Sequence, residues 1–244
     1  MVGSSLIHLA VDAVVFGYTP KESIRVLLIQ RRFNPFAGKW ALPGGFVRPE
    51  ESLEAAALRK LEEETGLQIN YLEQLYTFGQ PGRDPRKRVV SVVYYALVRP
   101  ESYNLHAQSD VDDARWFDIH DLPELSFDHK EIMESAIQRL RNKITYEPIG
   151  FELLEEKFPF SELQILYETL LEDKIDHRNF RKKLKGLGIL EELAETRKQQ
   201  GSGRPARLYR FNKDRYFKLR DAGISFIDLE VRPQELRRRM REGS

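Results

Sequence analysis

The sequence predicts an α/β protein in two parts: an α+β sandwich over residues 1–146 and a smaller helical domain with a hairpin over residues 147–244. Apolar, β-branched segments and two amphipathic helical segments are interspersed in the first part. Two short helices and a glycine-containing hairpin follow in the second part. The charge also changes, because Lys174–Arg220 carries 15 Lys/Arg against 5 Asp/Glu. An excess of ten positive charges predicts a polyanionic partner there.

Composition excludes several classes of protein. The hydrophobic fraction is 41% and the charged fraction 32%, which is typical of a soluble globular protein. The absence of cysteine excludes disulfides, thiolate catalysis and cysteine-based zinc sites. No segment reaches the roughly 18 apolar residues of a membrane helix, and Met1–Ala10 lacks the features of a signal peptide. We therefore expect a cytoplasmic protein without membrane association.

Five segments of the first part predict β-strands. They are apolar, and rich in β-branched or aromatic residues. A turn-type stretch separates the first two, so these should form a hairpin. The expected strands are Leu6–Val15, Ile24–Gln30, Trp40–Val47 (broken by Pro43-Gly44-Gly45), Val89–Val98 and Arg115–Phe117.

Two segments of the first part predict helices. Ser52 precedes apolar residues at helical spacing, and Gly66 is suited to end that helix. Phe127–Ile144 has a similar amphipathic pattern. The Thr145–Gly150 segment, which contains Pro148, is the expected linker between the two parts.

The first helix carries a candidate site. Residue 60 lies three and four positions before Glu63 and Glu64, so the three side chains share one patch of helix surface. Carboxylates at such spacing can chelate magnesium, which can clamp a pyrophosphate and polarise it for attack by water. Glu51 and Arg59 are expected to form an ion pair that fixes the preceding loop to the helix.

This segment resembles the signature of the Nudix hydrolases, G-x5-E-x7-R-E-U-x-E-E-x-G-U, in which U is apolar. The resemblance implies the Nudix α/β fold. One position departs from the signature, because Lys60 stands where the family has a glutamate that binds metal or is essential to catalysis. The matching residues are Gly45, Glu51, Arg59, Leu61, Glu63, Glu64, Gly66 and Leu67.

Lysine reverses the charge at this position. Its ammonium can reach Glu63 and Glu64 and neutralise the carboxylates that would hold a metal. We therefore expect nucleotide binding without hydrolysis, no catalytic residue, no required cofactor and at most weak metal binding at Glu63 and Glu64. The alternatives are an ordinary solvated acidic helix, or a substitute acid from outside the signature at Glu50, Glu62 or Asp84.

A further resemblance indicates the ligand. Pro81 lies fifteen residues after Gly66, about where ADP-ribose pyrophosphatases of this family have a proline. This implies ADP-ribose as the effector. Arg31 and Arg32, at the end of the second expected strand, could pair with its diphosphate. Phe33, Phe36 or Tyr76 could stack on adenine, although such aromatic residues are also common in cores and such arginines on surfaces. The full set of expected effector contacts is Arg31, Arg32, Gly44, Gly45, Phe46, Glu63, Glu64, Arg83 and Arg86.

The second part contains a basic helix that Asp176 can cap. Phe180, Leu184 and Leu187 form its expected buried stripe, and the other side is almost wholly basic. Such a helix suits the major groove, and the basic Glu195–Arg207 segment suits a wing that contacts phosphates or the minor groove. A solvated basic face, RNA binding and protein docking are the alternatives. The expected DNA contacts are Arg178, Asn179, Arg181, Lys182, Lys185, Arg204 and Arg207.

This part resembles the winged helix-turn-helix domain of the Nudix-related regulators of NAD metabolism, the NrtR family. Three segments carry the resemblance, together with Asp128-His129: Leu166–Glu168, Arg178–Lys182 and Gly203–Phe211. It implies a homodimer that binds a palindromic double-stranded operator, represses NAD-synthesis genes and responds to ADP-ribose. Related sugar regulators share the architecture. An active magnesium-dependent ADP-ribose pyrophosphatase with an accessory basic domain, and an RNA-processing hydrolase, are the rival functions.

Overall fold

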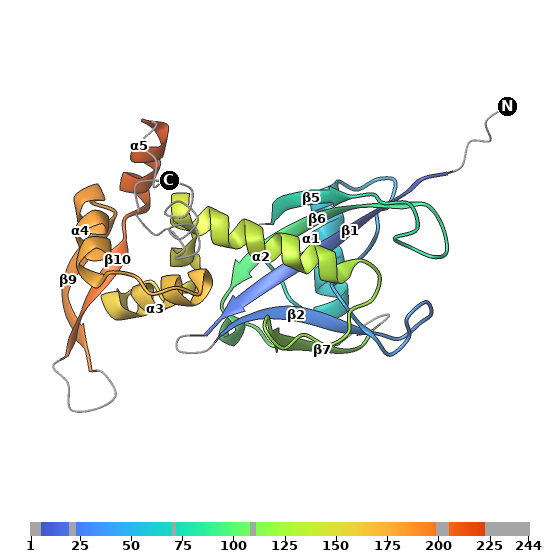
Figure 1. The fold of residues 1–244 in the computed structure, drawn as a ribbon, viewed down its shortest axis with the longest axis horizontal. Helices are drawn as coiled ribbons and strands as arrows, with labels where there is room; N and C mark the ends of the chain where they lie inside the picture. Colours follow the sequence, from blue (N-terminus) through green and yellow to red (C-terminus); the bar gives the residue numbers. More distant parts are fainter. Residues whose placement is uncertain (1–5, 20–22, 70–71, 108–110, 199–204, 223–244) are drawn as a thin grey trace, which may run out of the picture. The chain divides into compact units, whose positions relative to one another are not determined.

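The computed structural model divides the chain into two compact units between Arg139 and Leu140 (Figure 1). None of the helices in the described part of the chain is long and apolar enough to cross a membrane. The structure describes residues 6–19, 23–69, 72–107, 111–198 and 205–222.

The first unit is built on a mixed β-sheet. In the described ranges its central strand β1 (His8–Tyr18) runs parallel to β6 (Val89–Val98) and antiparallel to β2 and β4. The hairpin predicted from the first two strand segments is confirmed by the antiparallel pairing of β1 with β2. The other strands are β2 (Ile24–Arg31), β3 (Trp40–Ala41), β4 (Gly44–Phe46), β5 (Glu73–Phe78) and β7 (Val111–Asp118).

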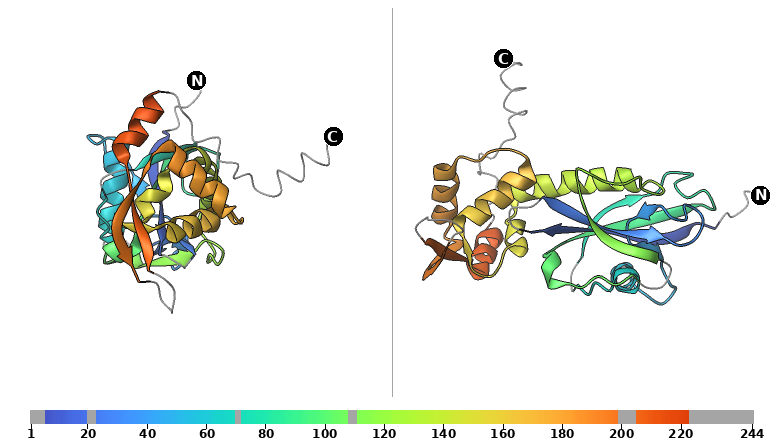
Figure 2. Two further views of the ribbon diagram at one scale, coloured as in Figure 1. Left: turned by 90° about the vertical axis from the view of Figure 1, so that its left-hand side faces the viewer. Right: turned by 90° about the horizontal axis from the view of Figure 1, so that it is seen from below.

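Helices α1 (Leu53–Thr65) and α2 (His129–Tyr146) lie on opposite faces of this sheet (Figure 2). Ala56, Ala57 and Leu61 of α1 are buried against alternate residues of β1, among them Val11 and Val15. Since side chains alternate across a strand, one face of β1 packs on α1 and the other is left for the opposite layer. The predicted α/β sandwich is confirmed.

The ends of α1 follow from the sequence. The Ser52 hydroxyl accepts a hydrogen bond from the backbone N–H of Ala55, and Gly66 ends the helix in the left-handed conformation, at φ 73°. Both are standard terminating devices, because they satisfy backbone groups that lack helical partners. They fix the helix that carries Arg59, Lys60, Glu63 and Glu64.

Three details of the first unit differ from the sequence prediction. The break after β3 spans only Leu42 and Pro43, because Gly44-Gly45 already pair with β1 in β4. Strand β5, which the sequence pattern did not reveal, has four of its six residues incompletely buried, so its apolar signal is weak. The Thr145–Gly150 segment, expected as a linker, is largely helical, since α2 continues to Tyr146 and a 3₁₀ helix (Ile149–Leu153) follows, and the division between the units falls within α2 instead.

The second unit is a winged-helix domain. Its small sheet has the order β8-β10-β9, from β8 (Phe158–Pro159), β10 (Ala206–Phe211) and β9 (Leu190–Arg197). Helices α3 (Phe160–Leu171) and α4 (His177–Leu187) precede β9, and α5 (Lys213–Asp221) follows β10. The predicted order of helix, helix and basic hairpin is therefore confirmed.

Three details of the second unit refine or extend the sequence prediction. Within the expected wing, β9 continues to Arg197, because Thr196 and Arg197 pair with Arg207 and Ala206 across the hairpin. Leu187 is only half-buried, whereas Phe180 and Leu184 of the expected stripe are buried. Helix α5 was not foreseen, and none of its residues is buried. Arg204 lies outside the described residues.

Candidate effector site and DNA-binding face

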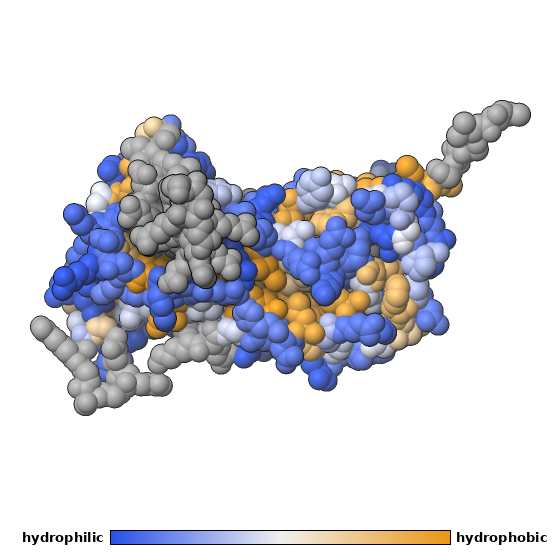
Figure 3. Space-filling view, in the orientation of Figure 1, coloured by the Kyte–Doolittle hydropathy of each residue, from blue (hydrophilic) through white to orange (hydrophobic). Residues whose placement is uncertain are grey.

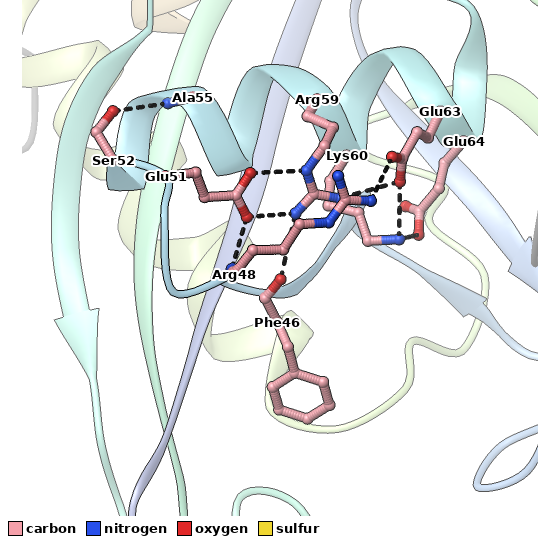
Figure 4. Close-up of polar contacts among 9 residues, drawn as sticks. All are labelled: Phe46, Arg48, Glu51, Ser52, Ala55, Arg59, Lys60, Glu63 and Glu64. Carbon is pink, nitrogen blue, oxygen red and sulfur yellow. Dashed lines mark hydrogen bonds and ion pairs between the residues drawn. The ribbon is translucent and has the colours of Figure 1, made fainter.

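The loop before α1 is fixed to the helix by the expected ion pair. Arg59 donates to both carboxylate oxygens of Glu51, at 2.6 and 2.8 Å, and to the carbonyl of Phe46 (Figure 4). The hydrogen bond from Arg59 lowers the pKa of Glu51 to about 2. The backbone N–H of Arg48 donates to the same carboxylate, at 2.7 Å. The Gly45–Glu51 segment is therefore held against the first two turns of α1.

Lys60 lies between the two carboxylates of the signature. Its ammonium is 3.4 Å from Glu63 and 3.4 Å from Glu64, and its side chain is only 15% exposed (Figure 4). Glu63 also receives hydrogen bonds from Arg59 at 3.0 Å and from Arg48 at 3.2 Å. Burial alone would raise the pKa of Glu63, but Arg59 and Lys60 hold it below its usual range. The predicted reach of Lys60 to both glutamates is confirmed.

Glu64 is the most buried acid of α1, at 4% exposure. Burial raises its pKa to about 7, although the charge of Lys60 and the hydrogen bond from the Gly44 N–H, at 3.0 Å, act in the opposite direction. No group of three or more His, Cys, Asp or Glu in the described part of the chain is placed to hold a metal ion. The carboxylate oxygens of Glu63 and Glu64 are instead engaged by cationic side chains and by a backbone amide.

Close packing requires glycine at position 44 and places the Lys60 side chain against Gly45. A Cβ on Gly44 would lie 2.3 Å from a carboxylate oxygen of Asp12, and one on Gly45 would lie 2.4 Å from Cε of Lys60. Any side chain would displace these atoms. The glycines therefore allow the β4 backbone to lie against both the buried aspartate and the lysine.

A buried polar network lies beside the glycines. Arg83 donates twice to Asp128, at 2.7 Å each, and approaches Asp12 at 3.4 Å. Ser91 also donates to Asp12, at 2.6 Å. His129, at the start of α2, accepts a hydrogen bond from the Leu42 N–H through Nδ1, and burial lowers its pKa. This network joins β1, β6, the loop before β6 and the start of α2.

Arg31 is the predicted effector arginine without a carboxylate partner among the described residues. Its guanidinium donates to the carbonyls of Pro35 and Phe33 and lies 4.9 Å from the Phe127 ring centroid. Burial and the positive charge of Arg86 lower its pKa. Arg86 itself pairs with the buried Asp84 at 2.8 Å. The attraction of Arg31 to Glu64, Asp84 and Asp12 is outweighed by burial and by Arg86, which leaves a half-buried cation that favours binding of an anion.

Two other expected effector contacts lie in different surroundings. Arg32 pairs with Asp112 at 2.8 Å and donates to the carbonyl of Val111, so its charge is directed to β7. The Phe46 ring is 39% exposed, and the ammonium of Lys87 lies 4.1 Å from its centroid.

The acids proposed as substitutes for the missing glutamate do not join Lys60. Asp84 is buried and paired with Arg86, Glu62 accepts from Gln68 on the exposed side of α1, and Glu50 is exposed. Asp12 was not predicted as a site residue, and Asp128-His129 was predicted only as part of the family resemblance. A signal existed for Asp12, since an acidic residue in the middle of an apolar strand must find buried partners.

The DNA-binding candidates divide into two sets. Arg178, Asn179 and Lys182 are exposed on α4, which Asp176 caps by accepting from the Asn179 N–H at 2.7 Å. The described surface around α4 and β9 is largely hydrophilic on the face drawn in Figure 3. These three residues are available to a partner that approaches the N-terminal half of the helix.

The second set already has partners within the domain. Arg181 donates to the Tyr209 hydroxyl, and its guanidinium lies 5.4 Å from the Phe160 ring centroid. Lys185 and Arg207 both pair with Glu192, at 2.8 and 3.3 Å. Arg181 therefore contributes to the packing of α4 on the sheet, and the other two share one carboxylate.

Comparison with known proteins identifies both units. Residues 6–140 match the NUDIX domain family and residues 150–211 the NrtR DNA-binding winged helix domain. The fold and signature thus define a Nudix domain joined to a DNA-binding winged helix.

Particular relatives cover most of the chain. The ADPR-responsive transcriptional repressor NtrR of Acinetobacter baylyi is 35% identical over 207 residues, which cover 83% of this chain and 81% of the relative. The structure of Shewanella oneidensis NrtR complexed with a 27mer DNA is 37% identical with a TM-score of 0.71, over 85% of this chain and 94% of that chain. The Nudix domain of the same protein, complexed with ADP-ribose, is 42% identical with a TM-score of 0.52, over 55% and 89%. The chain belongs to the NrtR family.

Proposed function

We propose that this protein is a transcriptional repressor of NAD-metabolism genes that binds ADP-ribose in its Nudix domain and responds to it without hydrolysing it. The single observation that carries the proposal is the position of Lys60. Its ammonium, 3.4 Å from both Glu63 and Glu64, stands where the family has a catalytic glutamate. Family membership and the relatives' complexes with DNA and ADP-ribose support the binding functions.

The loss of hydrolysis follows from electrostatics. Magnesium catalysis of diphosphate cleavage needs a cluster of free carboxylates. Here Glu63 faces three cationic side chains, and Glu64 is engaged by Lys60 and the Gly44 N–H. A divalent cation would have to displace the ammonium of Lys60, which its own side chain holds beside both carboxylates. The lysine replaces the charge of a metal but provides no open coordination position for water.

We assign the diphosphate of the effector to Arg31. Its guanidinium is half-buried, lies near Arg86 and has no carboxylate partner among the residues described. An anion there would relieve the repulsion between the two arginines. Arg83 is less suited to bind the diphosphate, because it already forms ion pairs with Asp128 and Asp12. Its role is to hold the start of α2 against the site.

We assign base contacts to Arg178 and Asn179 and a phosphate contact to Lys182. All three are exposed on α4. Arginine suits guanine and asparagine suits adenine in the major groove. A homodimer would present two such helices to the two halves of a palindromic operator. The effector can change DNA affinity only if it prefers one of the dimer's arrangements.

The test compares wild-type protein with Lys60→Glu, which restores the family's acid. Calorimetry should detect ADP-ribose binding by the wild-type protein, with no release of AMP and ribose 5-phosphate in the presence of magnesium. Lys60→Glu should gain magnesium-dependent release of both products. Turnover by the wild-type protein would instead establish an ADP-ribose pyrophosphatase. Binding of sugars in place of ADP-ribose would reassign the effector.

A further inference from the structure

One carboxylate, that of Glu192 on β9, holds two basic residues of the DNA-binding domain. The ammonium of Lys185 on α4 lies 2.8 Å from it, and the guanidinium of Arg207 on β10 lies 3.3 Å from it. The three residues come from three different elements, and all of their side chains are more than a third exposed.

The sheet register places Glu192 on the side that α4 covers. Glu192 is opposite Tyr209 in the β9–β10 pair, and side chains at opposed positions share a face. The Tyr209 ring centroid is 5.9 Å from the Lys185 ammonium, and its hydroxyl accepts from Arg181. The hydrogen bond from Lys185 lowers the pKa of Glu192, so the carboxylate is ionised at neutral pH. A negatively charged side chain therefore lies among basic residues that the sequence predicts to contact DNA.

A neighbouring acid provides a contrast. Glu191 is opposite Arg210 and pairs with it at 2.9 Å. Because successive side chains of a strand point to opposite faces, Glu191 lies on the side of the sheet away from Tyr209 and α4. It is the same residue type in the same strand with the same kind of partner, but it holds none of the expected DNA contacts.

We propose that Glu192 is a specificity-determining residue: in the free protein it takes the place of a DNA phosphate, so that Lys185 and Arg207 can bind DNA only by leaving it. The inference rests on the proposed DNA-binding function of α4. Both pairs are solvent-exposed, and exposed ion pairs exchange readily for another anion. A correctly docked operator would replace both contacts, whereas a loosely held duplex would not. Glu192 therefore weakens non-specific binding more than specific binding.

Counterion release makes the proposal measurable. Each phosphate contact changes the slope of log K against log salt by about −0.9, which corresponds to roughly eightfold in affinity at 0.1 M salt relative to 1 M. Glu192→Gln keeps the size and hydrogen-bonding capacity of the side chain but removes its charge. On a duplex of mixed sequence, fluorescence anisotropy across a salt series should show tighter binding and a slope steeper by about one to two. The gain should be smaller on an operator selected from a random pool.

Glu191→Gln is the matched control and should leave the slope unchanged. A second comparison separates the local effect from the overall change in charge. When Lys185 and Arg207 are both replaced by Gln, adding Glu192→Gln should no longer change the slope. Thermal unfolding of every variant is measured as well, to verify that the compared slopes belong to folded proteins.

Three results would overturn the proposal. Glu192→Gln could leave affinity and slope unchanged, it could weaken binding, or it could still steepen the slope in the Lys185 and Arg207 double variant. A weaker complex would mean that Glu192 positions α4 rather than competing with phosphate. If the wild-type protein bound no duplex at all, the proposed function would fail as well, so the two failures are distinguishable.

Discussion

Replacing Glu64 by Gln should change how the stability of the protein depends on pH. The Glu64 carboxyl is almost fully buried, and burial raises its pKa from 4.5 to about 7. A raised pKa means that the folded state binds the proton more tightly than the unfolded chain does. The resulting stabilisation is complete below pH 4.5 and is lost as the pH rises through 7.

The size of the effect follows from the shift. A difference of about 2.5 pKa units at about 1.4 kcal/mol each amounts to about 3 kcal/mol. Gln cannot ionise, and its amide oxygen can still accept from the Gly44 N–H. The free energy of unfolding of Glu64→Gln, measured relative to wild type, should therefore rise by about 3 kcal/mol between about pH 4 and pH 8.

The assay is urea unfolding of both proteins across this pH range, without divalent cations. Glu62→Gln removes a carboxylate from the exposed side of the same helix and controls for the change in net charge. A difference between Glu64→Gln and wild type that does not vary with pH would show that the folded state does not raise the pKa of Glu64. A difference of opposite sign would show that Lys60 outweighs burial and holds Glu64 ionised.

Three further outcomes are expected. Arg31→Gln should reduce ADP-ribose affinity in calorimetry by about tenfold or more, because one charge-assisted contact is lost. Arg32→Gln should leave the affinity unchanged. Equal losses in the two variants would contradict the assignment of the diphosphate to Arg31. Asp176→Ala should lower the free energy of unfolding by about 1 kcal/mol, because α4 loses its N-cap hydrogen bond; unchanged urea unfolding would count against it. Arg178→Glu should abolish operator binding in a gel-shift assay and leave ADP-ribose binding intact, so retained binding would remove α4 from the DNA interface.

Local sequence signals predicted most of the elements near the site. Each of three capping residues forms its capping hydrogen bond with a residue close to it in the sequence, and each caps the helix that its position indicates: Ser52, Gly66 and Asp176. The signature on α1 likewise depends on helical spacing, so the contacts of Lys60 with Glu63 and Glu64 could be anticipated. Spacing along one helix is enough to determine such neighbours.

The remaining features depend on contacts between distant segments. The partners of Asp12 come from residues 83 and 91, and only the parallel pairing of β1 with β6 brings them near. The two predicted diphosphate arginines, Arg31 and Arg32, are adjacent in the chain, yet only tertiary structure directs one to Phe127 and the other to Asp112. Sharing of Glu192 by Lys185 and Arg207 depends similarly on the packing of α4 against the hairpin.

The most direct test of sensing without hydrolysis measures DNA occupancy and effector integrity in one sample. The full chain is bound to an operator selected from a random pool, ADP-ribose and magnesium are added, and anisotropy follows the DNA while chromatography follows the nucleotide. We predict that ADP-ribose changes the fraction of DNA bound and is recovered intact. Release of AMP and ribose 5-phosphate at enzymatic rates would contradict the proposed function. So would a fraction of bound DNA that does not change when ADP-ribose is added.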